Sequence, residues 1–238
     1  MVGLPPTLPL SLTSMQPDAN TNPRIFDLVV FDNDGTLNSE TSCWQYTHEG
    51  FGTYESVGKK LLEHHLEHRT PYDEYARANL VHWKGHAKEK FLKIIRSIPL
   101  RDGAVEVLHY LRERGYKIGV ISSGFSFWRD LFRDDWGIEF DFYCTNEILF
   151  DANDICTGEI ILNTTDNVPG KDKGAIFKRE VEKLGIPFDR TVMVGDGWGD
   201  VAAMKLAARA YCVGDNFPEV REASEWLGHT LLPLMVRV

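Results

Sequence analysis

No stretch of this sequence is apolar over the length needed to cross a membrane, and positive charge is scarce. A membrane-spanning helix needs about 20 consecutive apolar residues, so we expect no membrane insertion and no membrane partner. The 26 lysines and arginines are outnumbered by 35 aspartates and glutamates, which gives a formal net charge of −9. This excess of negative charge argues against nucleic acid or an anionic membrane surface as a partner.

Cysteine is also scarce, and its spacing excludes the usual metal and redox motifs. The chain has four cysteines, which lie far apart and form no CxxC pair: Cys43, Cys144, Cys156 and Cys212. A chain of 238 residues that is 43% hydrophobic can bury a full core without disulfide cross-links. We therefore expect reduced, mostly buried thiols in a cytoplasmic protein.

The first 24 residues differ in composition from the rest of the chain. Residues 1–22 contain four prolines and many serines, threonines and asparagines, and they lack the basic start of a signal peptide. We interpret 1–24 as a disordered leader. The sequence leaves open whether translation starts at Met1 or at Met15.

The most informative stretch is LVVFDNDGT, where four apolar residues lead into Asp32 and Asp34. A short apolar run is typical of a buried parallel strand, and binding sites lie at the carboxyl ends of such strands. The spacing places both acids on one side, and Gly35 allows the chain to turn around what they hold. Two such carboxylates need a cation or a shared proton, and Mg²⁺ is the natural cation for oxygen ligands. Alone, the pattern equally describes a strand followed by an acidic turn.

A second apolar run, at 116–121, ends in Ser122, Ser123 and Gly124. A hydroxyl and the backbone N–H groups of a following turn can bind a phosphate there. A serine that caps the next helix is the alternative interpretation.

Two further segments carry charged residues at the start of helical patterns. The glycine-flanked turn at 169–176 contains Lys171 and Lys173, either of which could neutralise a phosphate or a carboxylate. The apolar run at 191–195 ends in Asp196 and continues through a glycine-rich loop to Asp200. These acids are a second source of cation ligands. A solvated basic turn and an aspartate-capped helix are the alternatives.

In this order, the four segments resemble the motifs of the haloacid dehalogenase superfamily, and Asp34 is typical of its phosphatase branch. The resemblance implies that Asp32 is the nucleophile and Asp34 the general acid/base. It assigns phosphate binding to Ser122, Ser123, Gly124 and Lys173, with the DKGA register favouring Lys173 over Lys171. It assigns Mg²⁺ binding to Asp32, the backbone carbonyl of Asp34 and Asp196, with Asp200 as an auxiliary ligand.

The order of apolar runs and helical patterns predicts an α/β fold with a doubly wound parallel sheet. The expected strands are 25–32, 117–122, 140–144, 191–196 and 208–213, and the resemblance implies the order 5-4-1-2-3. A small β-excursion is expected at 149–162. Residues 25–37 and 100–238 would form the catalytic core, and residues 38–99 a helical cap.

The segments ISSGF at 121–125 and NSET at 38–41 are similar to segments of the phosphoserine phosphatase branch, so within the superfamily the chain looks most like that branch. That resemblance makes Glu40 a candidate for binding a substrate ammonium. The carboxylate-binding arginine of that branch falls near Asn79, and Arg77 lies about 200° around a helix from that position. The three cap residues are therefore candidates for substrate specificity, and a related small phosphomonoester is as strong a candidate substrate as phosphoserine.

The function that we predict is a Mg²⁺-dependent phosphomonoesterase, monomeric or homodimeric, acting on a small metabolite through an aspartyl-phosphate. A phosphotransferase or mutase on the same scaffold is one alternative. A non-catalytic binding protein with the same fold is another. His64 and His68, at helical i, i+4 spacing, offer a Zn²⁺ site as an alternative to the acidic one.

Overall fold

The computed structural model describes residues 24–165 and 168–238. Residues 1–23 of the expected leader, including Met15, lie outside the described residues. Arg24 is described, and its guanidinium binds the Asp27 carboxylate and the carbonyl oxygen of Gly115. In the described ranges, no helix is both long and apolar enough to span a bilayer.

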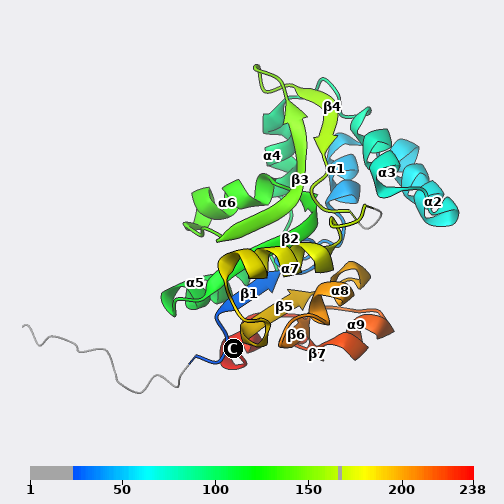
Figure 1. Cartoon of the computed structure of the whole chain (residues 1–238). Coiled ribbons are helices and arrows are strands. Elements are labelled where there is room, and N and C mark those ends of the chain that lie inside the picture. Colours follow the sequence, from blue (N-terminus) through cyan, green and yellow to red (C-terminus); the bar gives the residue numbers. More distant parts are fainter. Residues whose placement is uncertain (1–23, 166–167) are drawn as a thin grey trace, which may run out of the picture.

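A seven-stranded sheet forms the centre of the molecule, in the order β4-β3-β2-β1-β5-β6-β7 (Figure 1). The strands are β1 (Leu28–Phe31), β2 (Lys117–Phe125), β3 (Phe142–Phe150), β4 (Cys156–Ile161), β5 (Thr191–Gly195), β6 (Arg209–Cys212) and β7 (Glu225–Trp226). All neighbouring pairs are parallel except β3 and β4, which form an antiparallel hairpin. The α/β fold and the predicted order of the five parallel strands are confirmed, because 5-4-1-2-3 corresponds to β6-β5-β1-β2-β3.

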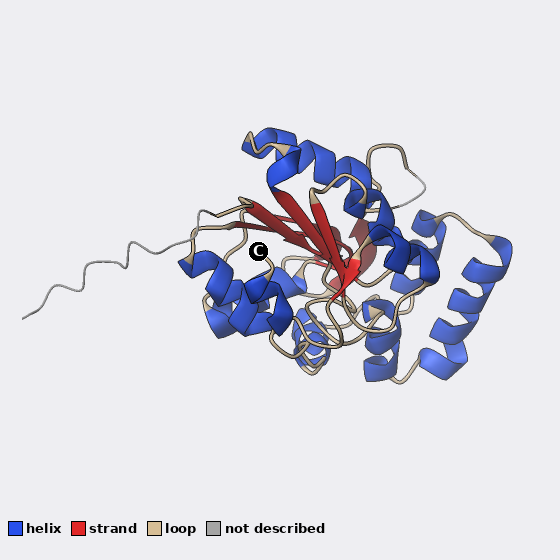
Figure 2. Cartoon of the chain, turned by 90° about the horizontal axis from the view of Figure 1, so that it is seen from below, coloured by secondary structure: helices blue, strands red, loops and turns tan. Residues whose placement is uncertain are grey.

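Helices cover both faces of the sheet, as Figure 2 shows. Along β1, Val29 and Phe31 face one apolar cluster, while Leu28 and Val30 face the other. This alternation follows from the two-residue period of a strand. The helices after the cap are α5 (Ala104–Glu113), α6 (Phe127–Trp136), α7 (Lys173–Leu184), α8 (Val201–Met204) and α9 (Pro218–Ala223). All four residues of β1 are fully buried, and each large apolar side chain contributes about 1.5–3 kcal/mol by leaving water.

The strand register brings the candidate residues together. Phe31 pairs with Val120 of β2 and with Val194 of β5. Asp32, Ser122 and Asp196 follow these positions by one or two residues. Because the strands are parallel, their carboxyl ends meet at the same edge of the sheet.

The segment between β1 and α5 is helical. It contains α1 (Cys43–Phe51), the π-helical turn Tyr54–Gly58, α2 (Lys59–His68), α3 (Tyr72–Leu80) and α4 (Lys88–Arg96). A β-bridge between Asn38 and Leu100 marks where the chain leaves the core and returns to it. We call the helical segment between these two residues the cap.

The cap packs tightly on the core. Trp44 of the cap makes an edge-to-face contact with Phe125 of β2, with ring centroids 4.8 Å apart, and stacks on Trp83 within the cap at 5.6 Å. The cap is also tied to the β3–β4 hairpin, because Gly85 N donates to the carbonyl oxygen of Cys156 at 2.9 Å. The apolar residues of cap and core therefore form one continuous cluster.

Candidate active site

Asp32 stands at the carboxyl end of β1 and is only 6% exposed. Its Oδ1 accepts a hydrogen bond from the backbone N–H of Asn33 at 2.7 Å. Its Oδ2 lies 2.8 Å from Nζ of Lys173, the first residue of α7. The carboxylate is thus held at a buried position by a fixed N–H group and a fixed cation.

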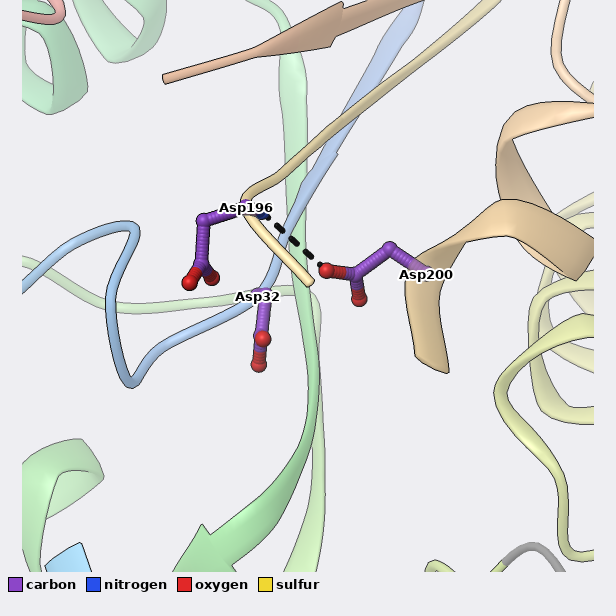
Figure 3. Close-up of side chains that lie close together, drawn as sticks. All are labelled: Asp32, Asp196 and Asp200. Atoms are coloured by element: carbon purple, nitrogen blue, oxygen red, sulfur yellow. Dashed lines mark hydrogen bonds between the residues drawn. The ribbon is translucent and has the colours of Figure 1, made fainter. Parts of the chain in front are cut away.

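Three carboxylates converge at this point, one after β1 and two from the loop after β5. Ligand oxygens of Asp32, Asp196 and Asp200 all lie within 4.8 Å of one another (Figure 3). The hydroxyl of Thr36 donates to Oδ1 of Asp196 at 3.0 Å. Gly35 is needed at this point, because a Cβ there would lie 2.1 Å from Oδ2 of Asp196 and because its φ is +77°.

Asp200 is fully buried, and both of its oxygens are occupied by groups of the protein. Oδ1 accepts from Nζ of Lys173 at 2.7 Å. Oδ2 accepts from the backbone N–H groups of Asp196 and Gly197, at 3.2 and 3.0 Å. Asp200 therefore orients both the lysine and the loop that carries Asp196, whereas Asp32 and Asp196 have more oxygen capacity left for a ligand.

The electrostatics of this cluster favour a bound cation. Burial, reinforced by the charge of Asp200, raises the pKa of Asp32 well above its usual range. The same two causes raise the pKa of Asp196 to about 7. Burial lowers the pKa of Lys173, but the charges of Asp200 and Asp32 outweigh it and the net shift is upward. A buried set of oxygen donors with excess negative charge fits a hard dication such as Mg²⁺.

Asp34 lies beside this cluster and is oriented by two side-chain amides. Its Oδ1 accepts from Nδ2 of Asn33 and from Nδ2 of Asn38, both at 2.9 Å. Its Oδ2 lies so close to Gly124 that a Cβ on Gly124 would approach it to 2.4 Å. A larger residue at position 124 would therefore displace the Asp34 carboxylate.

The expected turn after Ser122 is wrong. Residues Ser122 to Gly124 continue β2 as extended backbone, and the pairing with β3 shifts register between Ile121 and Phe125. The Ser122 hydroxyl accepts from Gly124 N at 3.2 Å. A bulged strand, rather than a turn, presents these groups, because β2 stays paired with β3 through Phe125.

A cavity of about 250 Å³ opens beside these residues. Core and cap both line it: Asp32, Asp34, Thr41, Ser42, Trp44, Tyr72, Ser122, Ser123, Gly124, Lys173, Asp196, Gly197 and Gly199. Pockets for drug-sized ligands measure about 300–1,000 Å³, so this one suits a small molecule. Lys171 is not among the lining residues; its Nζ donates to the carbonyl oxygen of Leu162.

Two lining residues of the cap, Trp44 and Tyr72, were not recognised in the sequence. Trp44 Nε1 donates to the Tyr72 hydroxyl at 3.0 Å, which in turn donates to the carbonyl oxygen of Ser123 at 2.7 Å. The two residues are 28 positions apart on different helices, so no local pattern indicates their contact. They tie the cap to the strand end that carries Ser122.

The three cap residues predicted to determine substrate specificity, Glu40, Arg77 and Asn79, are not among the residues that line the cavity. Asn79 is fully buried in the cap, where its Oδ1 bonds Nε2 of His48 at 2.7 Å and its Nδ2 donates to the carbonyl oxygen of Tyr75. Arg77 is exposed on the same helix. Glu40 is half-buried, next to the lining residue Thr41. The position aligned with a substrate-binding arginine is thus an internal residue of the cap.

The histidine alternative gains no support from the geometry. The rings of His64 and His68 stack with centroids 4.3 Å apart, and Nδ1 of His68 bonds the carbonyl oxygen of His64. Within 24–165 and 168–238, the acidic cluster is the one group of three or more possible ligands whose atoms lie this close together.

We expect Asp200→Ala to destabilise the fold strongly, because it leaves two loop N–H groups without their acceptor and removes one of the two partners of buried Lys173. A buried donor that is left without its acceptor costs about 1–3 kcal/mol, so the loss of both acceptor contacts should be measurable as a lower free energy of unfolding in urea. Asp189→Ala is the matched control, because Asp189 is exposed at the other end of β5. If both variants change the free energy of unfolding by only about 0.5 kcal/mol, as surface substitutions do, the assignment of a structural role to Asp200 is wrong.

Comparisons with known proteins agree with this geometry. A phosphoserine phosphatase of Archaeoglobus fulgidus is 32% identical over 186 residues, which cover 78% of this chain and 52% of that protein. A phosphoserine phosphatase of Methanocaldococcus jannaschii is 28% identical over 187 residues, which cover 78% of this chain and 85% of that protein. The chain thus spans about half the length of the first relative and most of the second.

Solved structures share the fold. A substrate-bound phosphoserine phosphatase complex superposes with a TM-score of 0.73 at 24% identity and covers 90% of this chain and 98% of that one. A phospho-aspartyl intermediate analogue of phosphoserine phosphatase gives a TM-score of 0.72, also at 24% identity, and covers 90% and 99% of the two chains.

The family model of the haloacid dehalogenase-like hydrolases matches residues 26–208, from two residues before β1 to the residue before β6. This span includes all four motifs and the cap. The resemblance that the sequence motifs indicated is confirmed, and so is the prediction of a hydrolase. The chain belongs to the haloacid dehalogenase-like hydrolases.

Proposed function

We propose that this protein is a Mg²⁺-dependent phosphomonoesterase that hydrolyses a small phosphorylated metabolite through an aspartyl-phosphate on Asp32. The observation that carries the proposal is the placement of Asp32. Its carboxylate lines a small cavity, 2.8 Å from Lys173, with Ser122 and Asp34 on the same lining. The residues to which we assign the roles of nucleophile, phosphate-binding group and acid/base therefore line one pocket.

In the first half-reaction, an Asp32 oxygen attacks phosphorus, a P–O bond to the carboxylate forms, and the bond to the leaving alcohol breaks. Asp34 donates a proton to the departing oxygen, so the alcohol leaves neutral. Lys173 and the Ser122 strand end hold the phosphoryl oxygens. When bound, Mg²⁺ supplies further neutralisation of charge on the phosphoryl group, and Asp32, Asp196 and the backbone carbonyl of Asp34 would hold it.

In the second half-reaction, water attacks the phosphorus of the aspartyl-phosphate. Asp34, now a carboxylate, takes a proton from that water, and the P–O bond to Asp32 breaks. The side-chain amides of Asn33 and Asn38, which donate to its Oδ1, keep the Asp34 carboxylate in the same orientation in both half-reactions. Inorganic phosphate leaves and the carboxylate of Asp32 is restored.

The relatives support this choice of reaction. The two relatives described above, each of which matches 78% of this chain, are named phosphoserine phosphatases. One structure with the same fold is described as a phospho-aspartyl intermediate analogue. Both observations favour phosphate monoester hydrolysis through an aspartyl-phosphate, which we assign to Asp32, directly after β1.

Asp34→Asn tests the acid/base role. An amide cannot donate the proton that an alkoxide leaving group needs, whereas p-nitrophenolate leaves without it. General acid/base catalysis typically contributes about 10²–10⁴-fold, so we expect kcat for an alkyl phosphate to fall by that much and kcat for p-nitrophenyl phosphate to fall far less. Steady-state phosphate release measures both, with Asp189→Asn as the control.

Equal losses on the two substrates would show that Asp34 is only structural or a metal ligand. Failure of the unmodified protein to release phosphate from either ester in the presence of Mg²⁺ would contradict the proposed function itself.

A further inference from the structure

The part of the pocket contributed by the cap is uncharged. It consists of Thr41, Ser42, Trp44 and Tyr72, which share the cavity with Asp32 and Lys173. Ser42 caps α1 by accepting from Gln45 N, and the Tyr72 hydroxyl is held between Trp44 and Ser123. Thr41 is exposed, and its hydroxyl makes no hydrogen bond within the described part of the chain. It is therefore available to a ligand. The cap wall thus offers hydroxyl groups and aromatic surface to whatever lies beside the phosphate.

The charged residues that line the pocket are unsuited to a second anionic group. Three are acids, Asp32, Asp34 and Asp196, and Lys173 is the one cation among the described lining residues. Lys173 is already paired with Asp32 and Asp200, at 2.8 and 2.7 Å. Residues 1–23 and 166–167 contain no lysine or arginine, so the residues outside the description add no basic side chain.

The cap wall is held in place by contacts to the core. Trp44 packs against Phe125 of β2, and Tyr72 donates to the carbonyl oxygen of Ser123. A cap that is tied to the phosphate-binding strand end by both packing and hydrogen bonds has its walls formed before the substrate arrives. The composition of these walls is therefore informative about the leaving group.

We propose that the preferred substrate of the phosphomonoesterase is the phosphate ester of a small, uncharged, hydroxyl-bearing alcohol, and that an ester with a carboxylate on its leaving group is a poor substrate. This inference rests on the proposed function and specifies its substrate class. The lysine and the cation site are engaged by the phosphoryl group, so a leaving-group carboxylate would face Asp34 and Asp196 without a cationic partner. A neutral polyol instead meets the Thr41 hydroxyl and the part of the Trp44 side chain that lines the pocket.

Two matched pairs of substrates test the proposal on the full chain with Mg²⁺. Glycerol 3-phosphate carries a hydroxymethyl group at the position where 3-phosphoglycerate carries a carboxylate. Phosphoethanolamine and O-phosphoserine differ by a hydrogen against a carboxylate. We expect kcat/KM to be roughly tenfold or more higher for the carboxylate-free member of each pair, and highest for glycerol 3-phosphate. A single lost charge-assisted hydrogen bond has an effect of about this size.

The outcomes separate this inference from the proposed function. Equal or faster turnover of the carboxylate-bearing members overturns the inference, and so does turnover of p-nitrophenyl phosphate together with none of the four esters. Turnover of none of the five overturns the proposed function. A preference for phosphoethanolamine over glycerol 3-phosphate would also overturn the inference and would favour Glu40 as an ammonium-binding residue.

Thr41→Lys provides a gain-of-function test, with Thr41→Met as a control of similar length. The ammonium would supply the missing partner for a leaving-group carboxylate. Relative to the methionine variant, we expect the ratio of kcat/KM for 3-phosphoglycerate over glycerol 3-phosphate to rise by roughly 10- to 100-fold. An unchanged ratio would show that the wall at Thr41 does not contact the leaving group.

Discussion

Asp32→Asn should abolish turnover while leaving the protein folded. The amide has the shape of the carboxylate but lacks its nucleophilicity, and removal of a nucleophile lowers kcat on the order of 10⁴–10⁶-fold. The wild-type protein, quenched in acid during turnover, should carry a phosphoryl group on the peptide that contains Asp32. The variant should carry none. Quench-and-digest mass spectrometry and steady-state phosphate release measure the two effects.

Stability provides the control for this substitution. Lys173 keeps its ion pair with Asp200 at 2.7 Å when the charge at position 32 is lost. Loss of that charge also relieves repulsion among the three clustered acids. We therefore expect the midpoint of thermal unfolding to stay close to that of the wild-type protein. Residual activity within tenfold of wild type in a folded variant would overturn the assignment of Asp32 as nucleophile.

The sequence allowed the sheet and the position of the motif residues to be predicted for a physical reason. Strands buried on both faces must be apolar throughout, so β1 and β5 stand out as short runs that end abruptly in acids. Parallel pairing then brings the ends of such runs to one edge. That reasoning places Asp32, Ser122 and Asp196 together without any knowledge of side-chain contacts.

The interior of the cap could not be predicted in this way. Its polar residues are satisfied by partners distant in sequence, as when Asn79 bonds His48, 31 residues earlier. An alignment by position assumes that a polar residue on α3 faces the pocket, but the side chain turns inward because the buried histidine provides a hydrogen-bonding partner. For the same reason, Trp44 and Tyr72 resemble ordinary core aromatics until tertiary packing places them on the pocket wall.

The role of Asp200 was also difficult to predict from the sequence. Its spacing from Asp196 suggested a cation ligand, yet its two oxygens serve Lys173 and the backbone of the preceding loop. Short-range hydrogen bonding of an aspartate to N–H groups three and four residues earlier competes with any ligand role. Sequence spacing predicts that these acids cluster, but it does not show which of them are available to a cation and which bind groups of the protein.

Removal of divalent cations should eliminate activity and lower stability together. In a chelator such as EDTA we expect no measurable phosphate release, with recovery on addition of Mg²⁺. At a Mg²⁺ concentration about 100 times Kd, binding stabilises the folded state by about 2.7 kcal/mol. For a protein of this size, each kcal/mol raises Tm by about 2–4 °C, so calorimetry with and without Mg²⁺ should show a clear upward shift.

The Asp196→Asn variant assigns that effect to the acidic cluster. It removes the negative charge of a side chain whose Oδ1 accepts from Thr36, in a loop that Asp200 holds through its backbone. We therefore expect the fold to persist. The Mg²⁺ concentration for half-maximal activity should rise by roughly tenfold or more, because the number of charged ligands sets the affinity of such sites. The Mg²⁺-dependent shift in Tm should shrink in parallel. Glu219→Gln, an exposed change on α9, should alter neither. Full activity in chelator would contradict the cation requirement, whereas rescue by Zn²⁺ alone, lost in His64→Gln, would move the metal site to the histidines of α2.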